Sequence, residues 1–471
     1  MTATPLSESP LWRWSSQFYE RAATEAWSKG TVPWRLTNSV RVAEAYGRMI
    51  TAWRADLIAA GLKTVDAPIE VLELGGGAGR LAFHLVRWLE AAKVPFQLMW
   101  TDAAQSNVEA FRARAFVHER PGVVEALKLD ALSERDAPPM APDVVIATYL
   151  FDTLPHDAWA VRGGKVFSRA VRVELPPGDA PECERAVLEW EDVEVDVPAF
   201  VRGYAPRVGE GVFMVPSGAL RCLARVGGWA HGRCLVLAAD KGEPDVAAVQ
   251  TGGNPKLQRH GGISAMVNFD AIRAWWGWRP FLRSAQAEPD LGFYALAQGL
   301  ETLAVTRATW SATLGAESLL HRLRELDALL QYPQPVKRLL EVLEAWRFDP
   351  DVFVRMAEPL RAAQPTPDEG ALLVEAIDRA WESHFEVGGA VDVAFEMATV
   401  LHRLGQLTHA ARFYERSLEA HGRHATVCFN LALCRLDLGD RERGAALLRE
   451  VLSLSPGHGG ATRILARLGA G

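Results

Sequence analysis

The stretch VLELGGGAGR, residues 71–80, decides the fold that the sequence predicts. It begins with aliphatic residues around one carboxylate, Glu73, as a buried strand would, and glycines follow at 75, 76, 77 and 79. A glycine cluster between a strand and a helix lets the backbone turn tightly and approach a ligand, while the helix offers unpaired N–H groups. The stretch therefore predicts a cofactor-binding turn.

The register of these glycines separates the possible ligands. A phosphate-binding P-loop requires GxxxxGK[ST], but Arg80 and Leu81 follow the last glycine, which argues against hydrolysis of ATP or GTP. A dinucleotide fingerprint requires GxGxxG, whereas this chain has GxGxG, which disfavours NAD without excluding it. Because a carboxylate beside the turn repels phosphate and attracts an ammonium or sulfonium group, Glu73 favours a cationic ligand.

The residues around this turn alternate between short apolar runs and amphipathic stretches. Strands are expected at 69–74, 96–100, 123–129 and 143–150, and helices at 78–92 and 103–116. Such alternation indicates right-handed βαβ units around a parallel sheet.

Other patterns flank this region. Apolar spacing of three and four residues predicts helices over 11–62, and alternating residues with Gly and Pro turns predict antiparallel hairpins over 158–197. Ser217 is expected to cap a helix, and a buried strand follows at 233–240. The Gly- and Pro-rich stretch 241–262 is interpreted as a mobile loop.

From about residue 312 the chain is predicted to be helical, with an internal repeat. Residues 391–424 align without gaps on 425–458, a period of 34 in which Gly405 matches Gly439 and Ala410 matches Gly444. This period and these small residues fit a tetratricopeptide repeat. Two repeats are few for a stable stack, so further helix pairs are expected over 316–388 and a capping helix over 459–471.

Composition narrows the function classes. The chain has 471 residues, 49% of them hydrophobic and 23% charged, and a net charge of −7, as expected for two or three folded domains. The mild negative charge argues against binding nucleic acid or an anionic membrane. No signal peptide or long apolar run is present, which predicts a cytoplasmic protein. The five cysteines lack metal-finger spacing, so no metal site is predicted.

The pattern ExGxGxG at 73–79 resembles motif I of class I S-adenosylmethionine-dependent methyltransferases. The resemblance implies S-adenosyl-L-methionine as cofactor and S-adenosyl-L-homocysteine as product. An acidic residue at the end of the second strand can accept hydrogen bonds from ribose hydroxyls, and the end of the third strand usually meets the adenine edge. The cofactor-binding residues predicted in this way are Glu73, Gly75, Gly77, Gly79, Asp102, Asp130 and Ala131.

A closer resemblance begins at DVVIATYLFDTLPHD, residues 143–157, which is similar to the signature of the MidA-type methyltransferase family. The later stretches GRCLVLAADKG and GGISAMVNFDAIRAWW also resemble that family, and the likeness spans roughly residues 65–305. It implies a Rossmann-like methyltransferase fold with inserted substrate-side elements. Members studied as protein arginine methyltransferases act in assembly of respiratory complex I.

This chain departs from the family at three places. The usual Asn-Glu pair is Thr148-Tyr149, the usual Asp-Tyr-Gly is Asp240-Lys241-Gly242, and the usual histidine before the second motif is Met266. Because a tyrosine cannot supply the negative charge that anchors a guanidinium, these departures put arginine as acceptor in doubt.

Catalytic candidates lie beyond the fourth strand, where open α/β sheets place their ligands. Tyr149 is a candidate to orient an acceptor, Asp152 to hold or deprotonate it, and His156 to act as a base near neutral pH. A structural role is the alternative: Asp152 as a turn cap and His156 as a packed histidine.

Together these features predict three domains. They are a helical preface at 1–64, a MidA-like class I methyltransferase domain at 65–310 and a helical tetratricopeptide-like domain at 311–471. The fold class is an α/β Rossmann-like domain, with a mostly parallel seven-stranded sheet and inserted hairpins, followed by an all-α repeat domain. The expected function is methyl transfer to a protein or peptide recruited by the repeats.

Two alternatives stay open for the whole chain. One is a methyltransferase for small molecules or natural products, in which the helical domain only dimerises or shields the site and the stretch 241–262 acts as a lid. If the helical domain dimerises, the expected assembly is a homodimer. The other is a non-catalytic scaffold that keeps the fold.

Overall fold

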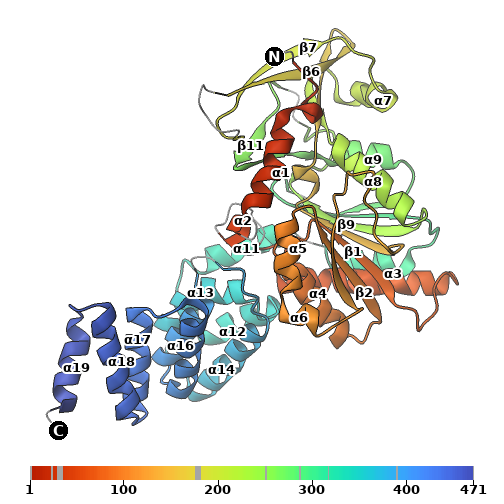
Figure 1. Cartoon of the computed structure of the whole chain (residues 1–471). Coiled ribbons are helices and arrows are strands. Elements are labelled where there is room, and N and C mark those ends of the chain that lie inside the picture. Colours follow the sequence, from red (N-terminus) through yellow and green to blue (C-terminus); the bar gives the residue numbers. More distant parts are fainter. Residues whose placement is uncertain are drawn as a thin grey trace. The chain divides into compact units, whose positions relative to one another are not determined.

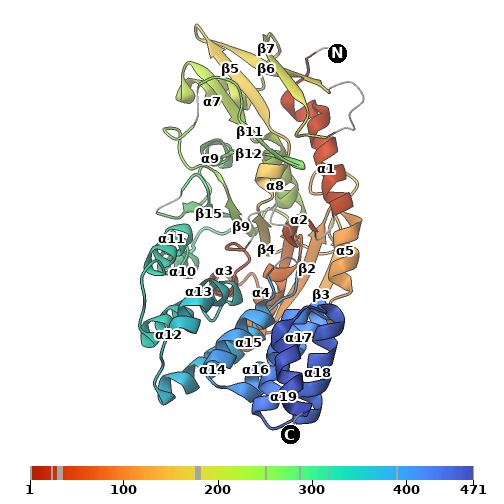
Figure 2. The same ribbon diagram turned by 90° about the vertical axis from the view of Figure 1, so that its left-hand side faces the viewer.

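The computed structural model describes residues 3–22, 25–28, 35–175, 182–249, 252–285, 288–316, 318–388 and 391–469 (Figures 1 and 2). The chain divides into two compact units, Met1–Arg322 and Leu323–Gly471. None of the described helices combines the length and the apolar character that a membrane crossing needs.

A seven-stranded sheet forms the centre of the first unit. Its strand order is β14-β15-β9-β4-β1-β2-β3, and every neighbouring pair from β9 to β3 is parallel. Strand β15 is antiparallel to β9, and β14 is antiparallel to β15. The strands are β1 (Ile69–Leu74), β2 (Phe96–Asp102), β3 (Val124–Lys128), β4 (Val144–Thr148), β9 (Cys234–Asp240), β14 (Phe281–Arg283) and β15 (Gly292–Gln298). The predicted mostly parallel seven-stranded sheet is confirmed.

Helices cover this sheet and connect its strands. They are α3 (Val40–Ala59), α4 (Arg80–Ala91), α5 (Gln105–Arg112), α6 (Ala115–His118), α8 (Ser217–Trp229), α9 (Phe269–Trp276) and α10 (Ala304–Ala312). One predicted cap is wrong: Ser217 is the first helical residue of α8, Pro216 is the N-cap, and no side chain caps the helix. The Ser217 hydroxyl instead lies 3.4 Å from the Pro155 carbonyl oxygen.

The inserted hairpins form a separate sheet, of order β7-β6-β5-β8. Its elements, with the helix α7 that precedes β8, are β5 (Asp157–Arg162), β6 (Lys165–Glu174), β7 (Val187–Val193), α7 (Ala199–Val208) and β8 (Gly211–Val215). The predicted hairpins are thus confirmed, apart from residues 176–181, which lie outside the described residues.

The N-terminal segment packs against this hairpin sheet. It contains η1 (Leu6–Glu8), α1 (Pro10–Ala22) and α2 (Glu25–Ser28). Leu6, Leu11 and Trp12 are buried in one hydrophobic cluster with residues of β5 and β6. Figures 1 and 2 both show α1 running from the hairpin sheet to α5.

The stretch 241–262, predicted as a mobile loop, is partly ordered. It contributes β10 (Gly242–Glu243), β11 (Leu257–His260) and the start of β12 (Gly262–Ala265), and β10 pairs with β13 (Val267–Asn268). Lys241, at its beginning, is buried. The stretch is therefore not a loop throughout, because residues distant in the sequence pair with its two ends, and residues 250 and 251 lie outside the described residues.

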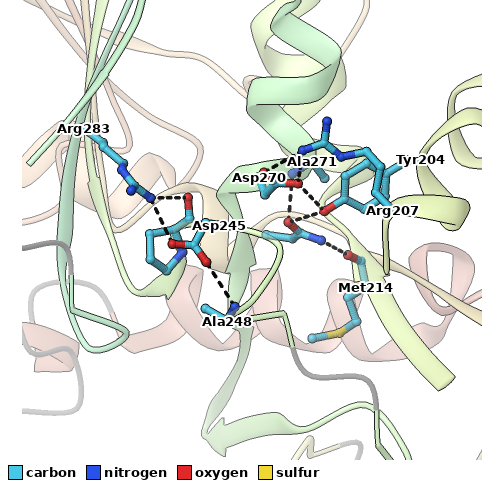
Figure 3. A network of polar contacts seen from close by, with 10 residues as sticks. Tyr204, Arg207, Met214, Asp245, Ala248, Asp270, Ala271 and Arg283 are labelled. Carbon is cyan, nitrogen blue, oxygen red and sulfur yellow. Dashed lines mark hydrogen bonds and ion pairs between the residues drawn. The ribbon is translucent and has the colours of Figure 1, made fainter. Parts of the chain in front are cut away.

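A polar network joins α7 to the start of α9 (Figure 3). The Tyr204 hydroxyl lies within 3.1 Å of both Asn268 and the buried Asp270, and the Arg207 guanidinium donates to both carboxylate oxygens of Asp270. The Asn268 amide also donates to the Met214 carbonyl oxygen. Since these contacts connect α7 and β8 with α9, they attach the inserted elements to a helix that covers the seven-stranded sheet.

The second unit is all helical. Most of its helices follow one another in antiparallel pairs: α12 (Val336–Ala345), α13 (Pro350–Ala362), α14 (Pro367–Glu382), α15 (Val393–Arg403), α16 (Leu407–His421), α17 (Ala425–Asp437), α18 (Arg441–Leu454) and α19 (Gly459–Gly469), after α11 (Leu319–Leu329). Gly405 and Gly439, 34 residues apart, have φ angles of 72° and 85° and end α15 and α17 in the same way. The predicted helix pairs and final helix are confirmed, while the repeat class stays a prediction.

We expect Gly444→Leu to destabilise the second unit by about 1–3 kcal/mol, because overpacking a tight helix contact costs that much. A Cβ atom at Gly444 would lie 2.6 Å from the Leu436 side chain of α17. Urea denaturation followed by circular dichroism measures the effect. Ala446→Leu, at an exposed position on the same helix, is the control. Equal stability of the two variants would contradict the close contact between α17 and α18.

Candidate functional site

Strand register brings the predicted site residues to one edge of the main sheet. Glu73 of β1 pairs with Trp100 of β2 and with Ile146 of β4, so the carboxyl ends of these three strands are level. On the other side of β4, Thr148 pairs with Ala239 of β9. Because parallel neighbours lie about 4.8 Å apart, the residues that follow these strands share one site.

The glycine turn is held by the strand beside it. Gly77 has a φ of 56°, and its N–H donates to Oδ2 of Asp102 at 3.0 Å. The other oxygen of Asp102 accepts from the Ala104 N–H at 2.9 Å. Asp102, which lies at the end of β2 as predicted, therefore joins the loop after β1 to the loop after β2.

The glycines of the turn meet different neighbours. A Cβ atom at Gly76 would lie 1.9 Å from Nε1 of Trp100, and one at Gly79 would lie 2.4 Å from Phe111, which stacks on Trp100. These two glycines allow the turn to pack on aromatic rings of the core. At Gly77 the neighbour is Trp27 of α2, whose ring atoms would lie 2.6 Å from an added Cβ.

Gly75 completes the predicted glycine set. Its φ is 63°, and a Cβ atom there would lie 3.1 Å from the Leu150 side chain. The turn therefore lies against the residues that follow β4, where the catalytic candidates are.

Glu73 is a buried carboxyl with an unused oxygen. Burial, and then the nearby Asp102 carboxylate, raise the pKa of Glu73 to about 8. Among the described residues, Oε2 of Glu73 has no hydrogen-bond partner. Because an unpaired buried polar atom costs about 1–3 kcal/mol, this oxygen is a place where a ligand that donates hydrogen bonds is favoured.

Asp130 and Ala131 follow β3, next to the end of β2. The Leu129 N–H donates to the Asp102 carbonyl oxygen, which keeps the two strand ends together. Asp130 is exposed, and its Oδ1 accepts from the Leu132 N–H at 2.8 Å, while Ala131 is buried. The carboxylate of Asp130 thus has a turn-forming role in this structure.

Tyr149 has a backbone conformation that is rare for its residue type. Its φ is 48°, and its N–H donates to the Ala239 carbonyl oxygen at 2.8 Å. Such a conformation costs about 1–3 kcal/mol and is common at functional sites. Burial, followed by the carboxylates of Asp240 and Asp152, raises the pKa of its phenol, which stays protonated at neutral pH.

Asp152 belongs to a buried cluster of charges at the ends of β4 and β9. Its Oδ2 lies 3.3 Å from the Lys241 ammonium, and its N–H donates to Oδ2 of Asp240 at 3.1 Å. Lys241 also donates to the Ser264 hydroxyl at 2.6 Å and to Gln258. Burial raises the pKa of both carboxyls, and the Asp152 charge raises that of Asp240 further, whereas Lys241 opposes the rise at Asp152.

His156 is fully buried near this cluster. Its Nε2 lies 3.1 Å from the Phe151 carbonyl oxygen, and its ring stacks on Trp12 of α1 with centroids 6.0 Å apart. Burial lowers the pKa of His156 to about 4, so the imidazole is neutral at pH 7. Its surroundings fit the packed histidine that the sequence left open as an alternative.

Sequence reasoning missed two residues of this site. Lys241 was noted only as a departure from a family pattern, although a lysine directly after a buried strand and an aspartate is itself a signal. Trp27 was missed because nothing in a single sequence indicates which distant glycine a tryptophan contacts. In the structure both residues lie beside predicted site residues: Lys241 beside Asp152, and Trp27 beside Gly77.

No family model matches this chain, and no curated protein matches it either. Among solved structures, it is similar to a COG1565 superfamily member from Burkholderia thailandensis bound to S-adenosyl-homocysteine, with 18% identity, 57% of this chain and 79% of that chain covered, and a TM-score of 0.40.

A second similar structure is an uncharacterized COG1565 superfamily protein from the same organism, with 16% identity, 64% of this chain and 90% of that chain covered, and a TM-score of 0.42. A third is a TPR protein with an unusual peptide-binding site, with 18% identity, 34% and 76% coverage, and a TM-score of 0.23. With every one of these TM-scores below 0.5, the likenesses do not decide the reaction, and the chain's own residues must carry any functional proposal.

Proposed function

We propose that the first unit is an S-adenosylmethionine-dependent methyltransferase. The observation that carries the proposal is the buried Oε2 of Glu73 beside a glycine turn, which has no hydrogen-bond partner in the described part of the chain. A donor ligand with an ammonium group supplies the missing hydrogen bond and a positive charge. A polyphosphate supplies neither, and its negative charge would oppose ionisation of the Glu73 carboxyl.

The residues at the strand ends fit this cofactor. Both oxygens of Asp102 already accept backbone N–H groups, but each carboxylate oxygen keeps a second acceptor position. Asp102 can therefore accept ribose hydroxyls while it holds the turn. The buried Ala131 provides an apolar surface at the place where the resemblance to methyltransferases implies that adenine binds.

When bound, the cofactor would supply a methyl group activated on a sulfonium. The chain must align an acceptor lone pair with that methyl and remove a proton when the acceptor carries one. Asp152 fits the second task, because the ammonium of Lys241 stabilises its ionised form. The phenol of Tyr149 fits the first task as a hydrogen-bond donor, and His156, with its low pKa, is a weaker base.

We further propose a protein or peptide as the acceptor, recruited by tetratricopeptide-like repeats in the second unit. A pocket of about 430 Å³ lies among α16, α17 and α18. Its apolar floor includes Leu418 and Leu431, and its rim carries Arg423, Arg435 and Arg443 together with three glutamates. This mixture suits a polypeptide segment with both apolar and charged side chains.

We expect Gly77→Ala to weaken S-adenosylmethionine binding at least tenfold, because a Cβ atom there collides with Trp27 and shifts the turn. Isothermal titration calorimetry with the full chain measures the affinity. Gly122→Ala is a matched control: Gly122 also has a positive φ, 73°, but has nothing within 4 Å of an added Cβ. Similar losses in both variants would contradict a role of this turn in binding.

We expect S-adenosylmethionine binding at pH 7 to release roughly one proton from Glu73, since a cation favours the ionised form of a neighbouring carboxyl. The sign follows from the raised pKa of about 8, which leaves the free carboxyl mostly protonated at pH 7. Calorimetry in buffers of different ionisation enthalpy counts the protons. Glu73→Gln should lose this release and bind about tenfold to a hundredfold more weakly. Equal proton release by both proteins would contradict the assignment.

We expect methyl label from S-adenosylmethionine to enter the protein fraction of a cell lysate, and Arg443→Glu to reduce that labelling severalfold without changing cofactor affinity. Arg443 lies on the pocket rim with an exposed side chain. Arg441→Glu, on the same helix outside the pocket, is the matched control. Label found only in small molecules would contradict a polypeptide acceptor, and no cofactor binding at all would favour a scaffold.

A further inference from the structure

Trp27 of α2 lies directly against the glycine turn. Its indole occupies the space that any side chain at position 77 would need, with Cζ2 and Cε2 at 2.6 and 2.7 Å from an added Cβ. Trp27 is half-buried, whereas its neighbour Ala26 is fully buried. The N-terminal segment therefore forms part of the wall of the candidate cofactor site.

A second ring extends this wall toward the catalytic candidates. The Tyr19 and Trp27 rings have centroids 6.3 Å apart and are tilted by 42°. A Cβ atom at Gly262 would lie 3.0 Å from the Tyr19 ring, and burial, followed by the Asp152 carboxylate, raises the pKa of the Tyr19 phenol. The two rings thus form one aromatic surface that begins at Gly77.

Hydrogen bonds hold the helix that carries Tyr19. The Ile263 N–H donates to the Ser15 hydroxyl at 3.1 Å. Nearer its end, Glu20 accepts from the N–H of Gln105, the first residue of α5, and from the Ser106 hydroxyl, both at 3.0 Å. Since α5 follows the loop that Asp102 organises, the aromatic wall is fixed to the same framework as the turn.

The charge of the site favours a cation beside this wall. Glu73 and Asp102 are buried here and each has a raised pKa, so an incoming cation favours their ionised forms, whereas Asp152 already has the Lys241 ammonium at 3.3 Å. An aromatic face attracts a cation within about 6 Å, and the attraction is stronger where water is excluded. A neutral thioether in the same place would gain only van der Waals contact with the ring and no attraction between charge and ring.

We propose that Trp27, supported by Tyr19, is an aromatic face that binds the sulfonium of the methyl donor and discriminates it from the neutral thioether product. The inference rests on the proposed cofactor but adds a selectivity that the glycine turn alone does not provide. Its consequence is weaker binding of the product, which favours its replacement by fresh donor.

The test compares Kd values for S-adenosylmethionine and S-adenosylhomocysteine by calorimetry on the full chain. We expect Trp27→Leu to weaken binding of the donor about tenfold and that of the product less than about threefold. Trp27→Phe, which keeps an aromatic ring, should retain most of the preference for the donor. Trp278→Leu, at a side chain that is 93% exposed, is the control and should change neither value.

The outcomes separate this inference from the proposed function. A wild-type chain that binds neither ligand overturns both. Where the wild type binds, equal losses for the two ligands in Trp27→Leu overturn the inference alone, because they indicate packing without recognition of charge. Tighter donor binding by Trp27→Leu also overturns it, since Trp27 would then obstruct the site. Thermal denaturation checks that each variant is folded.

Discussion

The carboxylate of Asp102 holds together the two loops on which the site depends. Strand pairing brings β1 and β2 side by side, and just beyond the end of β1 the Gly76 N–H donates to the Thr101 carbonyl oxygen. Asp102 extends this connection by accepting from Gly77 on one side and Ala104 on the other. Without it a buried N–H of the turn would be unsatisfied, at a cost of about 1–3 kcal/mol. The contact of the turn with Trp27 requires the same position of Gly77.

Several carboxyl groups are buried at the edge of the sheet where the parallel strands end, and burial disfavours their ionised forms. Glu73, Asp102, Asp152 and Asp240 are all buried, and burial raises the pKa of each. Burying an unpaired carboxylate costs several kcal/mol, so burial favours the protonated form of such groups and a nearby cation favours the ionised form. Only at Asp152 does the ammonium of Lys241 oppose this directly through an ion pair. At this edge an incoming cation would therefore favour ionisation of Glu73, whereas Asp152 already has a cation beside it.

The sequence was a good guide wherever structure follows from neighbours in the chain. The strands at 69–74 and 96–102, and the turn between them, are local patterns of apolar residues and glycines, and the 34-residue period placed α15–α18 correctly. It failed where partners are distant. Lys241 is ordered by Asp152 and Ser264, so the composition of its own segment was misleading. Ser217 was predicted to be the N-cap of α8, but it is the first helical residue and Pro216 is the N-cap.

The bond between Ser15 and Ile263 has a consequence for how the protein is made. The helix that carries Tyr19 is synthesised well before its partner in β12, which follows about 250 residues later. Contacts of such wide sequence separation form late because the intervening chain must first be ordered. Ser15 and Phe18 of α1 therefore wait for their partners at Ile263 and Gly261, a period in which aggregation competes with folding.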